Sequence, residues 1–170
     1  AAEAAAGAVQ LLLAEAMPRL HARDSLALVG DFLRARARAE LGAGAPVVDK
    51  IRQFYDHPGF IEPMIRNVRA ARATLPSEVR DGARLVFTAH SVPVSMATTS
   101  AYVPQLLEAS RLVAHATTPA GRDPLDVDLV WQSRSGPPQV PWLEPDISDH
   151  LAALVERGVP AVVLVPIGFV

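Results

Sequence analysis

The chain alternates between short apolar runs and longer stretches in which apolar residues recur at helical spacing. Residues 85–89 (LVFTA) are rich in β-branched and aromatic side chains, a pattern typical of a strand buried on both faces. Apolar runs of similar length predict further strands at residues 127–131 and 159–165, and residues 47–54 also read as a short strand. Each run is followed by polar, glycine or proline residues, which end strand pairing.

The longer stretches predict helices, because their apolar residues are three or four positions apart. Five helices are expected, at residues 1–21, 24–41, 60–75, 95–115 and 147–157. Asp24 and Ser25 are candidate caps for the second helix, and Asp146 or Ser148 for the last. Strand–helix alternation at this spacing predicts right-handed βαβ units. The expected fold class is therefore α/β, a parallel sheet flanked by helices. We expect residues 1–46 to form a separate helical segment.

Polar side chains follow the predicted strands where ligands bind to parallel sheets, just beyond the carboxyl ends. His90 follows the strand at 85–89, and Gln132 and Arg134 follow the strand at 127–131. His90 is therefore a candidate functional residue. The alternative is that it merely caps a strand-to-helix turn.

For the arginines of the second predicted helix and for two other histidines, a structural role is the favoured interpretation. Arg34, Arg36 and Arg38 alternate along the second predicted helix and are more typical of a solvated face than of a phosphate site. His57 lies in a turn beside a proline, where a structural role is favoured. His115 falls near a helix C-terminus, where a cation suits the helix dipole.

The composition excludes several classes of site. The 170 residues include no cysteine, which rules out disulfides, thiolate zinc sites, a cysteine nucleophile and cysteine-ligated iron–sulfur clusters in this sequence. A net charge of −2 gives no general attraction for nucleic acid or anionic membranes. No apolar run approaches the ~18 residues of a membrane span, and no basic segment precedes the alanine-rich start. We therefore expect a cytoplasmic location.

Familiar catalytic motifs are absent. The sequence lacks the dinucleotide-binding, P-loop, hydrolase-elbow and zinc-protease patterns. The first residue is not methionine and the last, Val170, follows an apolar run directly. We expect this sequence to be a piece of a longer protein.

Six motifs resemble those of ferrochelatases in order and spacing. They are FYDHPGFIEPM at 54–64, FTAHSVP at 87–93, YVPQLLEA at 102–109, VWQSRSGP at 130–137, WLEPDI at 142–147 and VLVPIGFV at 163–170. The resemblance covers residues 47–170, and the alanine and arginine usage suggests a high-GC bacterial version. It implies a doubly wound, chelatase-like lobe that is incomplete here, since the family continues past its P-x-G-F motif into a histidine and a catalytic glutamate. Residues 1–46 depart from the family, because residues 24–41 contain no tyrosine where the family has a tyrosine-rich segment.

The resemblance implies insertion of Fe²⁺ into a porphyrin in haem biosynthesis. The substrate would be coproporphyrin III in a high-GC Gram-positive host and protoporphyrin IX elsewhere. Iron is then a substrate, and no bound cofactor is expected. The family's histidine maps onto His90, as metal ligand, proton acceptor or both. Imidazole suits Fe²⁺, and its unperturbed pKa of about 6.5 suits a group that accepts pyrrole protons.

Family motifs also supply candidate substrate-binding residues. These are Ser91, Pro93, Gln132, Arg134 and Trp142. A guanidinium such as Arg134 can bind a porphyrin propionate. Trp131 and Trp142 have a structural alternative, as a strand-end packing residue and a loop anchor. For the whole chain, the alternatives are a protein that binds tetrapyrrole or metal without turnover, and a fragment without ligand affinity.

Overall fold

The chain divides into two compact units, Ala1–Arg52 and Gln53–Val170. The computed structural model describes residues 25–47, 52–119, 121 and 127–168. The predicted domain boundary at residue 46 stays a prediction.

The first unit contains helix α2, Ser25–Leu41, followed by the short 3₁₀ turn η2, Gly42–Gly44. Gly42 has a φ of 54°, the left-handed conformation that commonly ends a helix. The helix predicted at 24–41 is confirmed, whereas the helix predicted at 1–21 and the Asp24 cap lie outside the described residues. Arg36 pairs with Glu40 at 2.6 Å, and its side chain is half exposed, as expected for a solvated face.

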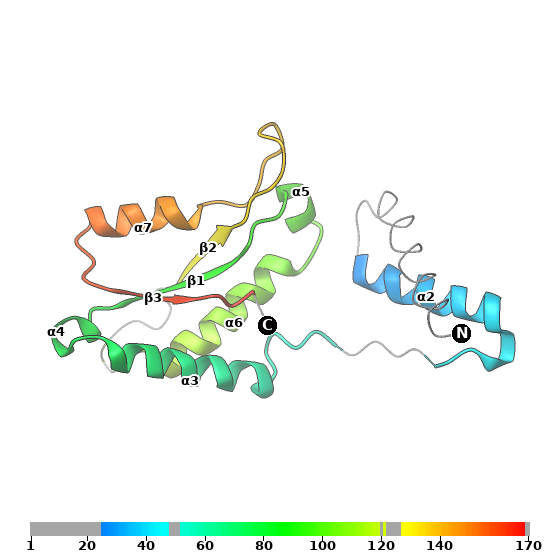
Figure 1. Ribbon diagram of the computed structural model, residues 1–170, viewed down its shortest axis with the longest axis horizontal. Helices are drawn as coiled ribbons and strands as arrows, with labels where there is room; N and C mark the ends of the chain where they lie inside the picture. The colour runs from blue at the N-terminus through cyan, green and yellow to red at the C-terminus, as the bar shows by residue number, and fades with distance from the viewer. Residues whose placement is uncertain (1–24, 48–51, 120, 122–126, 169–170) are drawn as a thin grey trace. The chain divides into compact units, whose positions relative to one another are not determined.

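The second unit is built on three parallel strands in the order β2-β1-β3 (Figure 1). They are β1, Arg84–His90, β2, Asp128–Gln132, and β3, Val162–Val165. These strands confirm the α/β prediction. The strand predicted at 47–54 is not seen in its described part, because residues 47 and 52–54 have no regular structure. The third strand is shorter than predicted and begins at Val162 rather than Val159.

Helices cover both faces of the sheet. In Figure 1, α3 and α6 lie on one side of the strands and α7 on the other. The helices are α3, Pro58–Thr74, α4, Ser77–Arg80, α5, Val94–Ala97, α6, Tyr102–Thr117, and α7, Ile147–Glu156. Of the two predicted caps of α7, Asp146 is the one observed, since its carboxylate accepts a hydrogen bond from Ser148 N at 2.8 Å.

The single helix predicted at 95–115 is wrong: the structure has two helices, α5 and α6. Pro104 lies in the first turn of α6 and has no N–H to bond to residue 100, a position that suits the start of a helix better than its interior. The hydroxyls of Thr98 and Thr99 also bond to the carbonyl of Ser95 and compete with helical hydrogen bonds. Helix α6 therefore starts afresh at Tyr102.

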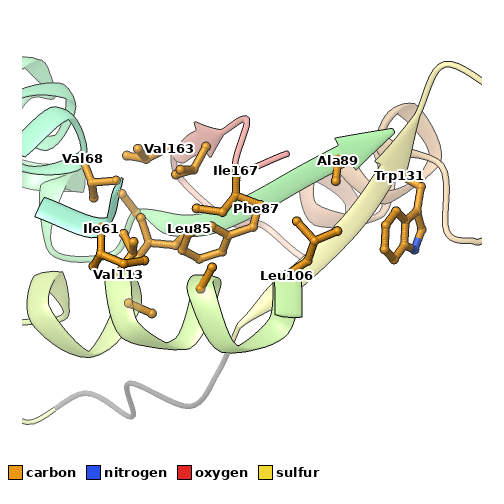
Figure 2. Close-up of a cluster of buried hydrophobic side chains, with 14 residues drawn as sticks. Ile61, Val68, Leu85, Phe87, Ala89, Leu106, Val113, Trp131, Val163 and Ile167 are labelled. Carbon is orange, nitrogen blue, oxygen red and sulfur yellow. The ribbon is translucent and has the colours of Figure 1, made fainter. Parts of the chain in front are cut away.

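Alternating residues of β1 fill two cores. Leu85, Phe87 and Ala89 face α3 and α6 in the larger core, which Figure 2 shows. Val86 packs with Val130 and Leu154 under α7 in the smaller one. Five consecutive residues of β1 are buried, and the strand becomes exposed only at His90. The sheet thus fixes the position of that residue.

Candidate functional site

The carboxyl ends of β1 and β2 lie side by side and bring two of the predicted site residues together. His90 and Gln132 are the last residues of their strands and face each other in the register of the parallel pair. Ala89 is fully buried, whereas the His90 side chain is exposed at the edge of the sheet. This is the position at which parallel sheets bind ligands.

The main chain around His90 is held by hydrogen bonds from both sides. The phenol of Tyr102, at the start of α6, donates to the carbonyl of His90 at 3.0 Å. The N–H of Ser91 donates to the carbonyl of Gln132 at 2.7 Å. Burial raises the pKa of Tyr102, which keeps its phenol protonated as a donor. The His90 backbone is therefore fixed between β2 and α6.

The imidazole of His90 has one nitrogen engaged. Its Nδ1 lies 2.5 Å from the carbonyl oxygen of Ser91. Because a carbonyl can only accept, this hydrogen bond places the proton on Nδ1 and leaves the lone pair on Nε2. Nε2 has no hydrogen-bond partner among the described residues. Nε2 is thus the nitrogen that can bind a metal ion or accept a proton.

Ser91 joins the strand end to the loop before α7. Its side chain is 2% exposed, and its hydroxyl donates to the carbonyl of Leu143 at 3.0 Å. Two main-chain hydrogen bonds run alongside: Leu143 N donates to Val92 O at 3.0 Å, and Val94 N to Pro141 O at 2.9 Å. These bonds bring the two segments together beside His90.

Pro93 and Trp142 face each other across this pairing. The Trp142 ring lies against Gly136, so closely that a Cβ on Gly136 would be 2.2 Å from Cζ2 of the indole. The indole Nε1 is buried and has no hydrogen-bond partner among the described residues. Trp142 is half-buried, in keeping with the loop-anchor interpretation, and its contact with substrate stays a prediction.

A cavity of about 430 Å³ opens between the strand ends and α7. Its lining consists of Ser91, Trp131, Arg134, Leu143, Glu144, Pro145, Asp146 and Asp149. Arg134 is exposed, with Nη1 3.9 Å from Glu144 Oε1 and Nη2 3.5 Å from the carbonyl of Pro138. The cavity therefore combines one guanidinium with three carboxylates. His90 and Trp142 are not among the residues that line it.

The structure also places the residues for which structural roles were predicted. His57 caps α3, because its Nδ1 accepts a hydrogen bond from Gly59 N at 3.0 Å. His115 lies in the last turn of α6. Trp131 is 4% exposed and its ring centroid is 6.0 Å from that of Tyr102. The structural roles of His57 and Trp131 are confirmed, whereas the interaction of His115 with the helix dipole stays a prediction.

Tyr102 was missed as a site residue. It belongs to one of the six motifs, but only the fold shows that the start of α6 returns to the end of β1. Within the described parts of the chain, no three histidine, cysteine or acidic residues are grouped so that they could hold a metal ion. In the same parts, no helix is long and apolar enough to cross a membrane.

Comparison with known proteins identifies the family. The sequence model of the family described as ferrochelatase matches residues 5–170. A coproporphyrin III ferrochelatase of Nocardia farcinica is 54% identical over 143 residues, which are 79% of this chain and 39% of the relative. Those of Mycolicibacterium smegmatis and Mycobacterium leprae are 54% and 50% identical over 139 residues, with 80% of this chain covered. The chain spans about 40% of the length of these curated relatives. With a match over nearly its whole length, the chain belongs to the ferrochelatase family.

Proposed function

We propose that this chain is part of an enzyme that inserts Fe²⁺ into coproporphyrin III, with His90 as its catalytic residue. The observation that carries the proposal is the geometry of His90, an exposed residue at the edge of the sheet whose Nδ1 bonds to the Ser91 carbonyl while Nε2 has no partner among the described residues. The relatives at about 50–54% identity are named for coproporphyrin III, which favours this substrate over protoporphyrin IX.

The reaction exchanges one Fe²⁺ for the two pyrrolic protons of the free-base macrocycle. Imidazole is a suitable ligand for Fe²⁺ as the ion loses its water, and also a suitable acceptor for a pyrrole proton. His90 offers only one lone pair, on Nε2, so these two roles exclude each other at any moment. His90 therefore acts by turns: it holds iron before transfer, and takes one of the two pyrrole protons only after the iron has left, while the other proton passes to water.

The other predicted residues surround this point. We assign Arg134 to a propionate of the porphyrin, because its guanidinium is exposed and its nearest carboxylate, Glu144, is 3.9 Å away. Gln132 and Trp142 contribute a polar and an aromatic surface beside His90 and Pro93. Ser91 acts through its buried hydroxyl, which holds the loop at Leu143. Substrate iron and porphyrin are the partners. We propose no bound cofactor and a cytoplasmic location.

The test uses a chimera in which this chain replaces the matching segment of the Nocardia farcinica relative. Iron insertion into coproporphyrin III is followed anaerobically by the loss of free-base fluorescence. Removing the imidazole with His90→Ala is expected to lower kcat at least 100-fold, whereas His115→Ala, an exposed residue of α6, leaves it unchanged.

Near-normal insertion by the His90→Ala chimera contradicts the assignment of His90. If the parent chimera binds porphyrin, as shown by fluorescence quenching, but inserts no iron, a binding protein without turnover is the correct interpretation. If it neither binds nor inserts, the chain has no ligand affinity of its own.

A further inference from the structure

The segment that follows β3 occupies a place beside the end of β1. Pairing between β1 and β3 ends at Phe87 and Val165, whereas pairing between β1 and β2 continues to His90 and Gln132. The next residues of the chain, 166–168, run along the side of β1 that β3 has left. Ile167 is 1% exposed and lies beside Phe87 in the larger core (Figure 2).

Gly168 makes the closest approach to β1. A Cβ at this position would lie 2.7 Å from the Cβ of Ala89, 3.0 Å from its Cα and 3.7 Å from the backbone nitrogen of His90. The separation of 2.7 Å is essentially never found for a real Cβ, so one of the two segments would have to move. Gly168 is not among the glycines with positive φ. Space, and not backbone conformation, therefore requires glycine here.

Ala89 and His90 have little room to yield. Ala89 is fully buried, and the next peptide is bonded to β2 through Ser91 N and the carbonyl of Gln132. The phenol of Tyr102 holds the carbonyl of His90. A methyl group on Gly168 would press the end of β1 toward β2 and change the angle at which the imidazole meets the Ser91 carbonyl.

We propose that Gly168 is a positioning residue for His90. Its lack of a side chain lets the end of β1 lie where Nδ1 reaches the carbonyl of Ser91, which directs Nε2 to the open edge. The inference rests on the proposed function in one respect, the role of His90 as the reactive group. The positioning itself can be tested without any activity.

The first measurement is the tautomer of His90 in the full 170-residue chain. Nitrogen NMR of the labelled imidazole, at a pH of about 8.5 where an ordinary imidazole is neutral, distinguishes a proton on Nδ1 from one on Nε2. The His90 signals are assigned by their loss in His90→Ala. We expect the Nδ1–H form in the parent chain and a shift toward the Nε2–H form in Gly168→Ala. The matched control is Gly44→Ala, since a Cβ on Gly44 meets nothing within 4 Å.

The second measurement is a double-mutant cycle across the contact. Ala89→Gly removes the methyl group nearest to Gly168 and opens the contact instead of crowding it. If the two residues act through one contact, Gly168→Ala combined with Ala89→Gly has a tautomer ratio closer to the parent than Gly168→Ala alone. Should Gly168→Ala fail to fold, Ala89→Gly alone is expected to shift the ratio, and the double variant to reverse that shift.

In the chimera, Gly168→Ala is expected to lower kcat about 10- to 100-fold with KM unchanged, because the reactive nitrogen is misplaced while the porphyrin contacts remain. A folded Gly168→Ala chain with the parent tautomer, or effects of the two substitutions that simply add, would overturn the proposal. An inactive parent chimera would contradict the proposed function alone, since the tautomer measurement still decides whether Gly168 positions His90.

Discussion

Asp128, the first residue of β2, joins the amino ends of two strands to α7. Arg84, the first residue of β1, donates to both of its carboxylate oxygens, with Nε at 2.7 Å and Nη2 at 2.8 Å. His150 Nε2 of α7 lies 3.2 Å from the same carboxylate. Burial alone would raise the pKa of Asp128, but the hydrogen bonds from Arg84 and the adjacent His150 outweigh it and hold the pKa below its usual value.

We expect Asp128→Asn to lower the free energy of unfolding by about 1–3 kcal/mol at pH 7, because Arg84 loses a half-buried charged partner. A carboxyl with a lowered folded-state pKa contributes stability above its unfolded pKa and loses it as the pH falls through the folded value. Urea unfolding at several pH values should therefore show the difference between parent and variant shrink below the ordinary aspartate pKa.

The control is Glu108→Gln, which removes an exposed ion pair with Arg111 on α6 and is expected to have a much smaller effect at any pH. A cost of Asp128→Asn that is the same at pH 3 and pH 7 would show that the charge of Asp128 is not what stabilises the strands.

At the residue scale, the position of His90 was predictable from the sequence and its partners were not. A polar residue directly after a buried apolar run lies at the edge of a parallel sheet. This inference needs no knowledge of the rest of the fold. Tyr102, which bonds to His90, comes from α6, and Leu143, which bonds to the neighbouring Ser91, comes from a distant loop. Only the tertiary structure shows which carbonyl accepts the hydrogen bond from each of the hydroxyls of Tyr102 and Ser91.

At the scale of elements, one phenol adds a hydrogen bond to the apolar packing between α6 and β1. Tyr102 donates to the carbonyl at the end of β1 and contacts the ring of Trp131 in β2, so it ties the start of the helix to both strands. The sequence motif predicted a helix here but not its first residue. The break at residues 98–101 depends on Pro104 and on local hydroxyl bonds, which the apolar periodicity of 95–115 does not reveal.

Tyr102→Phe is expected to lower the free energy of unfolding by about 0.5–1.5 kcal/mol, the usual net contribution of one hydrogen bond, while the ring contacts remain. Urea unfolding of the 170-residue chain measures it. The sequence has one other tyrosine, Tyr55, whose hydroxyl makes no hydrogen bond to the described residues, so Tyr55→Phe is the matched control. Equal effects of the two substitutions would mean that the bond to His90 contributes nothing.

At the scale of the whole molecule, the core that the structure describes belongs to the second unit. Both buried clusters consist of residues from 55 onward among those the structure describes. The parallel sheet and flanking helices could be predicted, because buried strands read as continuous apolar runs. The strand expected at 47–54 shows the limit of that reasoning, since this segment is not a continuous apolar run and its described residues, 47 and 52–54, have no regular structure.

A chain of residues 53–170 alone is therefore expected to keep the fold of the second unit. The near-ultraviolet circular dichroism of Trp131 and Trp142 should match that of the full chain, and the urea midpoint should change little. Loss of the tryptophan signal on removing residues 1–52 would show that the first unit is needed to complete the core.

The sheet places the groups that stabilise the fold and the group proposed for catalysis at opposite ends of its strands. The Arg84–Asp128–His150 group lies at the amino ends of the strands, and His90 lies at their carboxyl ends, with the buried middle of β1 between them. Substitutions that make the protein more robust often reduce catalysis when both properties draw on the same residues. Here stability and catalysis depend on residues at opposite ends of β1. Substitutions at the amino end that raise the stability can therefore be selected without changing the chemistry at His90.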